Sequence, residues 1–245
     1  MGRFVVLRRL AWVGALVALG LATGCASNRD QAAASDTARL QKQAALAADA
    51  ATVLQQQMLQ PSQARIPRAL IEKARCIAVF PTVTEAGLIF GGSRGTGLIS
   101  CRQRTGNYVD APPAVYKLSS ASIGLQAGAA QSSVVLLFTT VQSTRAVLDS
   151  LVKLGSQVAV SAGPRGYDQP IRDSAPIVAY GISKKGLFAG VNLGGGKVAF
   201  EKQRNSVIYD VTDPQPRDIL LQTPRIPQSM ANYVDTVEQF TNSAG

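Results

Sequence analysis

The sequence contains no histidine. This absence excludes Ser-His-Asp and Cys-His nucleophile systems, and every metal site that needs an imidazole ligand. Acidic residues are also few, 15 in a chain of 245, and no spacing typical of a two-metal centre or a glycosidase carboxylate pair occurs. The composition therefore argues against an enzyme, and we predict neither a metal ion nor a cofactor.

Aromatic residues make up only 6% of the chain, which leaves little for the stacking recognition of nucleic-acid bases. The 25 lysines and arginines exceed the 15 acids and give a formal net charge of +10. The positive residues are scattered, without the blocks of like charge that are typical of nucleic-acid-binding tails. A diffuse positive surface of this kind suits anionic lipid head groups better, and we expect no nucleic-acid partner.

The N-terminus lacks an apolar run long enough to span a bilayer, because Leu10–Ala22 is shorter than the about 20 residues that a spanning helix needs. Arginines precede this run, as in a secretory signal peptide. Ala22-Thr23-Gly24-Cys25 then resembles the lipobox of bacterial lipoproteins. The resemblance implies removal of residues 1–24 and lipidation of Cys25. In the envelope systems that this leader resembles, a residue after the cysteine that is not acidic, here Ala26, implies the outer membrane, facing the periplasm. An ordinary secretory signal is the alternative.

Two cysteines remain after the leader, Cys76 and Cys101. They can pair in an oxidising compartment. Their spacing, in a chain without histidine, gives no zinc signature. We predict a disulfide between them, with two separate buried thiols as the alternative.

Two glycine-rich stretches, Gly91–Gly97 and Lys184–Lys197, fail as phosphate-binding loops. The first departs from GxGxxG and precedes an expected strand, whereas a dinucleotide needs a helix N-terminus there. The second departs from the P-loop, because Val191 and Val198 stand where that motif has glycine and serine or threonine. We interpret its glycines as the turn of a hairpin between VNL and KVAF, which needs a positive φ.

Hydrophobic periodicity predicts an α+β fold. Residues 25–35 are expected to be a short tether, followed by a helix that Pro61 ends. A second helix is predicted over residues 66–75, and further helices over residues 143–152 and near the C-terminus. Between them, short apolar runs divided by glycine and proline predict an antiparallel β-sandwich or barrel-like sheet flanked by N- and C-terminal helices. Without internal repeats, we read residues 36–245 as a single domain.

Five blocks occur in the order that is typical of the SYLF domain family: KARCIAVFP, GGSRGTG, GLQAGAAQ, VAVSAGPRG and SKKGLFAGVNL. The chain resembles this family over residues 66–202, and more weakly to Leu221. Such modules occur in eukaryotic membrane-trafficking and actin-associated proteins, and alone in bacterial lipoproteins. The resemblance implies binding of an acidic phospholipid or another envelope lipid, and it brings no catalytic residue.

The candidate head-group contacts are cations beside apolar residues, together with the loop cations of GGSRG and GPRG. The helix over residues 66–75 is amphipathic enough to lie on a head-group surface, and the Lys184–Lys197 stretch combines lysines with Leu187 and Phe188. In both places the alternative is that the apolar residues pack in the core and the cations are simply solvated. The candidates are Arg68, Lys73, Arg75, Arg94, Arg165, Lys184, Lys185 and Lys197.

The leading hypothesis is a lipid-anchored, periplasm-facing lipoprotein that binds anionic phospholipid or another envelope lipid. The alternative is a structural or interaction protein of the envelope, in which the sheet edge or the long N-terminal helix contacts a protein partner.

Overall fold

The computed structural model describes residues 24–87, 90–123, 128–155, 158–161, 175–183, 188–189, 193, 195–222 and 225–242. The chain divides into two units, Met1–Arg39 and Leu40–Gly245. The sheet and its core belong to the second unit.

The helical elements are α1 (Gly24–Leu59), α2 (Arg68–Lys73), α3 (Val141–Leu148), α4 (Lys202–Tyr209), α5 (Pro216–Leu221) and α6 (Ala231–Asn242), with 3-10 turns at Ser62–Ala64 and Gln228–Met230. Helix α1 begins at Gly24, so residues 25–35, expected to be a tether, are helical. Among the described residues, no helix combines the length and apolarity that crossing a membrane requires. Helix α3 ends earlier than predicted, because Ser150 has a positive φ of 72° and a strand begins at the next residue.

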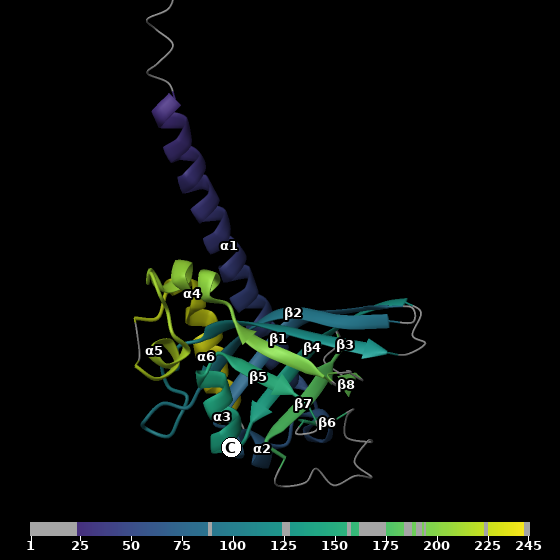
Figure 1. The fold of residues 1–245 in the computed structure, drawn as a ribbon. Coiled ribbons are helices and arrows are strands. Elements are labelled where there is room, and N and C mark those ends of the chain that lie inside the picture. The colour runs from purple at the N-terminus through teal and green to yellow at the C-terminus, as the bar shows by residue number, and fades with distance from the viewer. Residues whose placement is uncertain are drawn as a thin grey trace, which may run out of the picture. The chain divides into compact units, whose positions relative to one another are not determined.

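The strands are β1 (Cys76–Gly87), β2 (Phe90–Cys101), β3 (Ala114–Ile123), β4 (Gly128–Phe138), β5 (Leu151–Leu154), β6 (Val158–Ser161), β7 (Ile177–Ile182), β8 (Phe188–Ala189) and β9 (Gly196–Phe200). In the described residues they form one sheet in the order β5-β9-β3-β2-β1-β4-β7-β6, with β8 paired to β7. Their pairing is antiparallel except between β6 and β7. The sheet, whose central strands are its longest, curls into a half-barrel (Figure 1). The predicted α+β class with a barrel-like sheet and flanking helices is confirmed.

Both faces of the curled sheet are buried over its central strands. Ile77 and Val79 of β1 pack in one core cluster together with residues of α1, α2 and α6. Ala78 and Phe80 pack in a second cluster with residues of α3, α5 and β5. Successive residues of a strand point to opposite faces, so the unbroken apolar run CIAVF supplies both clusters at once.

Gly97, in the GGSRGTG block, allows β1 and β2 to approach closely. A Cβ built at this position would lie 2.3 Å from the carbonyl oxygen of Val79 and 2.5 Å from Cδ1 of Phe80. The β1–β2 register shifts between Val79 and Thr82, at the same place. This glycine therefore serves strand packing, which agrees with its failure as part of a phosphate-binding loop.

We expect Gly97→Ala to lower the free energy of unfolding by about 2 kcal/mol, because the added methyl group overpacks the strand contact. Urea denaturation measures the change. Gly155→Ala is the matched control, since a Cβ there meets no heavy atom within 4 Å. Equal effects of the two substitutions would show that the contact does not require glycine.

The hairpin predicted between VNL and KVAF is wrong. Strand β9 pairs with β3 along one edge and with β5 along the other. A strand has only two edges, so no place remains for the preceding residues to pair with it. The turn itself is present, since Gly195 has a φ of 65°. Period-2 alternation identified the strand, but its partners come from distant parts of the chain.

A disulfide and the hydrogen bonds of one arginine connect α2, the start of β1 and the end of β2. The Sγ atoms of Cys76 and Cys101, which are register partners, are 2.00 Å apart in a disulfide. Next to it, the Arg102 guanidinium donates hydrogen bonds to the carbonyl oxygens of Ala74 at 2.7 Å and Glu72 at 2.8 Å. The guanidinium carbon also lies 5.1 Å from the centre of the buried Tyr108 ring.

Candidate functional site

Four cations on neighbouring strands share one face of the sheet. Arg94 of β2 pairs with Ser119 of β3, Ser119 pairs with Lys197 of β9, and Lys197 pairs with Lys153 of β5. Register partners point to the same side of a sheet, about 4.8 Å apart between strands. Lys117 lies two residues before Ser119 on β3 and therefore on that side too. We call Arg94, Lys117, Lys153 and Lys197 the basic face.

Strand alternation keeps the basic face outside. The neighbours Leu118, Val152 and Val198 are buried in the second core cluster, which turns the adjoining cations to the other face. Arg94, Lys153 and Lys197 are exposed, and Lys117 is partly exposed. In the described part of the chain, none of the four cations has an ion-pair partner.

A groove of about 540 Å³ lies beside the basic face. One wall is α1, whose residues Lys42, Leu46 and Asp49 share one helix face at spacings of four and three residues. Arg94 and Lys117 contribute from the sheet. Helix α4 supplies Arg204, and its N-cap residue Glu201 also lines the groove. We call this hollow the α1–α4 groove.

The α1–α4 groove is lined by more positive than negative side chains. Its cations are Lys42, Arg94, Lys117 and Arg204, and its carboxylates are Asp49 and Glu201. Arg204 Nε lies 3.8 Å from Glu201 Oε2. Asp49 has no ion-pair or hydrogen-bond partner in the described residues.

The position of α4 beside the sheet depends on Asn205, which is fully buried. Its side-chain oxygen accepts from the Val115 N–H at 2.8 Å, and its amide donates to the Val115 carbonyl at 2.9 Å. The same amide donates to the Glu201 carbonyl at 3.0 Å. The side chain thus takes the place of a strand neighbour for β3, and it holds Arg204 and Glu201 at the groove.

The structure separates the cations predicted from sequence into two groups. Arg94 and Lys197 join the basic face. Arg68, Lys73 and Arg75 are exposed around α2, where Arg68 Nε lies 2.6 Å from Glu72 Oε1. Arg75 precedes β1, whereas Arg94 pairs with Thr84 near the far end of that strand. At about 3.3 Å per strand residue, the nine residues from Arg75 to Thr84 place the two groups roughly 30 Å apart along the strand.

Helix α2 uses its apolar side in the core. Leu70 and Ile71 are buried in the first core cluster together with Ile66. In the described structure, only the polar side of this helix faces solvent, as in the alternative interpretation of a packed helix with solvated cations. Arg165, Lys184 and Lys185 lie outside the described residues. Cys25 falls in α1, and the structure does not describe its side chain.

Sequence reasoning missed Lys42, Lys117, Lys153 and Arg204. Lys117 and Lys153 lie in VYKLSS and LVKLG, where alternation alone predicts an outward lysine between inward apolar residues. Nothing in the sequence indicated that these two strands lie on either side of β9. Lys42 and Arg204 resemble any solvated helix cation until the fold brings their helices to one groove.

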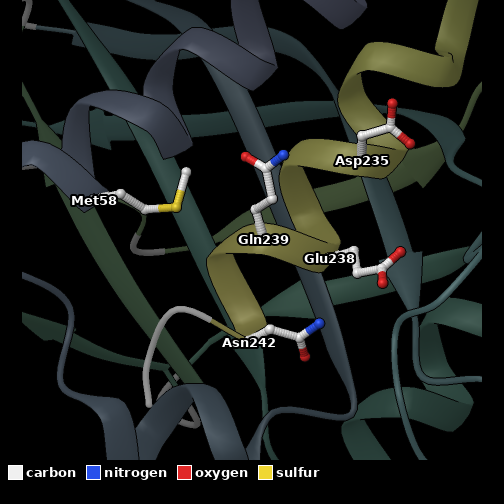
Figure 2. Close-up of a pocket in the computed structure, with 5 residues that line it drawn as sticks. All are labelled: Met58, Asp235, Glu238, Gln239 and Asn242. Atoms are coloured by element: carbon white, nitrogen blue, oxygen red, sulfur yellow. The ribbon is translucent and has the colours of Figure 1, made fainter.

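A second hollow, of about 670 Å³, separates Met58 at the end of α1 from Asp235, Glu238, Gln239 and Asn242 of α6. Figure 2 shows the carboxylates of Asp235 and Glu238 pointing away from Met58. Nowhere in the described residues do three or more histidine, cysteine or acidic side chains gather as a metal site would require. The described residues that line this hollow include two acids on one helix and no serine, cysteine or lysine.

Four buried tyrosines have raised pKa values, and all four have a structural role in the core. Burial raises the pKa of Tyr108, Tyr116, Tyr209 and Tyr233 far above the ordinary value of 10.0. Their hydroxyls donate to backbone carbonyls, for example Tyr116 to Val147 at 2.8 Å and Tyr108 to Ala74 at 3.1 Å. These groups are structural hydrogen-bond donors and do not line either hollow.

Comparison with known proteins places this fold in a family. Residues 119–240 match the Ysc84 family model, which is described as a Las17-binding protein actin regulator. The chain is 30% identical over 151 residues to Protein YSC84 of Saccharomyces cerevisiae, an alignment that covers 59% of this chain and 31% of the relative. It is 27% identical over 181 residues to SH3 domain-containing YSC84-like protein 1 of Xenopus laevis, covering 72% and 53%. The chain spans about a third to a half of these relatives. The chain therefore contains a Ysc84 domain, the SYLF domain that its sequence resembles.

Proposed function

We propose that this protein is a lipoprotein of the bacterial cell envelope whose SYLF domain binds anionic phospholipid without catalysing a reaction. Lipidated Cys25 would tether it to the outer membrane, with the domain facing the periplasm. The lipobox-like Ala22–Cys25 segment supports the anchor. The bonded Cys76 and Cys101 suit an oxidising compartment.

The basic face is the observation that carries lipid binding. Its four cations project from adjacent strands of one sheet, and no described acid forms an ion pair with them. A lysine or arginine near an anionic membrane surface contributes about 1 kcal/mol to binding. Because the sheet holds the four cations on one face, all four can contact the same membrane surface, and their contributions to binding add.

Flotation of the non-acylated chain, starting at Ala26, with vesicles tests this proposal. We expect it to float with vesicles that contain phosphatidylglycerol and to remain behind with neutral vesicles at low salt. Raising the salt to 1 M should release the protein, because the Debye length falls from about 10 Å at 0.1 M to about 3 Å. Flotation that ignores both acidic lipid and salt would contradict head-group binding.

A protein partner is the second candidate function, and the names of the relatives favour it. The chain is 29% identical over 151 residues to LAS seventeen-binding protein 3 of Saccharomyces cerevisiae, a name that describes protein binding. In this chain the corresponding role would be that of an interaction protein of the envelope. Crosslinking in intact cells followed by affinity purification should then recover one stoichiometric protein partner, whether or not lipid is extracted.

A further inference from the structure

We infer that the α1–α4 groove selects a phospholipid head group in which the phosphate ester carries an ammonium with N–H donors, as ethanolamine phosphate does. This inference rests on the proposed function and adds selectivity for one head group to it. The basic face attracts an anionic surface of any composition, whereas the groove distinguishes one head group from another.

The cations of the groove converge from different elements. Arg94 and Lys117 lie on adjacent strands, Lys42 lies on α1, and Arg204 lies on α4. Charge-assisted hydrogen bonds from such groups to phosphate oxygens are roughly twice as strong as neutral ones. A phosphate within the groove is therefore within the reach of donors from more than one wall.

The carboxylates make this groove different from a plain anion site. Asp49 and Glu201 repel a bare phosphate and weaken its binding. An ionised carboxylate accepts hydrogen bonds and attracts positive charge, so it favours a ligand with a charged N–H group. Asp49 is the clearer acceptor, because Glu201 already lies beside Arg204 while Asp49 has no partner in the described residues.

The order of charges along α1 matches a ligand with two ends. Lys42 and Asp49 are about 10 Å apart along the helix axis at about 1.5 Å per residue, with Leu46 between them on the same face. At this spacing the long Lys42 side chain can contact the phosphate of a head group while Asp49 contacts its ammonium. Choline phosphate carries the same charges but no N–H, so it lacks the donors that Asp49 would accept.

Vesicles that differ only in ethanolamine or choline head groups test the inference. The full non-acylated chain is mixed with vesicles of constant phosphatidylglycerol content, in which the remainder is phosphatidylethanolamine or phosphatidylcholine. We expect roughly tenfold tighter binding to the ethanolamine vesicles, the worth of one hydrogen bond to a charged group. Asp49→Asn should abolish this preference while keeping the dependence on phosphatidylglycerol, whereas Asp235→Asn on α6 should keep both.

Soluble head groups separate recognition in the groove from a general effect of ethanolamine lipids on the bilayer. Glycerophosphoethanolamine should compete for the ethanolamine vesicles more strongly than glycerophosphocholine or inorganic phosphate. Equal affinity for both vesicles, or equal competition by all three compounds, would overturn the inference. In that case a retained need for phosphatidylglycerol leaves the proposed function standing, whereas flotation without any need for acidic lipid removes both. Urea denaturation of Asp49→Asn confirms that the variant is folded.

Discussion

Neutralising the basic face is expected to weaken binding to anionic vesicles by roughly a thousandfold. The variant carries Arg94→Gln, Lys117→Gln, Lys153→Gln and Lys197→Gln. Each cation near the surface contributes about 1 kcal/mol, so four contribute about 4 kcal/mol, close to three orders of magnitude in affinity. These side chains point away from the second core cluster, so the fold should tolerate their replacement. Titration of the protein with vesicles measures the loss.

A control of equal charge separates the basic face from the overall positive charge. Arg68→Gln, Lys73→Gln, Arg75→Gln and Arg145→Gln remove four exposed cations from α2, its flank and α3. If only net charge matters, the two variants should lose the same affinity. If α2 is the membrane contact, this control should lose more. Either result would contradict the assignment of the basic face.

Breaking the Cys76–Cys101 disulfide is expected to lower the free energy of unfolding by about 3 kcal/mol, since the bond closes a loop of 25 residues in the unfolded chain. Both cysteines are buried in the second core cluster, so the bond is a structural one. Guanidinium denaturation with and without reductant measures this contribution.

The Cys76→Ala, Cys101→Ala double variant serves as the control for reduction. Its stability should be low and should not depend on reductant, while the wild-type stability should fall towards it once the bond is reduced. A wild type that keeps its full stability when a thiol assay shows two free cysteines would contradict a structural role. Such a result would also remove one support for an oxidising compartment.

Most of the fold class could be read from local patterns. The helix before Pro61, the short helix after Pro67 and the succession of short strands follow from periodicity and from the positions of glycine and proline. The choice between sandwich and barrel could not be made in this way. It depends on how far the whole sheet curls between α1, α2 and α6 on one side and α3 and α5 on the other, which no local pattern reports.

The residues of the candidate site, too, could be identified only in part from the sequence. Arg94 was a candidate as a cation of an expected loop, and Lys197 as a cation at the turn of the expected hairpin. Lys117 and Lys153 were overlooked because each stands alone in a strand of apolar and small residues. Cross-strand pairing turned these scattered positions into one surface, and it also left Arg68, Lys73 and Arg75 at a distance from that surface.

The sequence by itself determined the α+β class, the family resemblance and the weakness of any case for catalysis, since these depend on composition, local periodicity and ordered blocks. Only the tertiary structure decided which cations lie together on one face. Alternation determines the face to which a residue points within its own strand, but not which strands become neighbours. Strand order comes from burying both faces of the whole sheet, so β9 lies between β3 and β5, and Lys197 between Ser119 and Lys153.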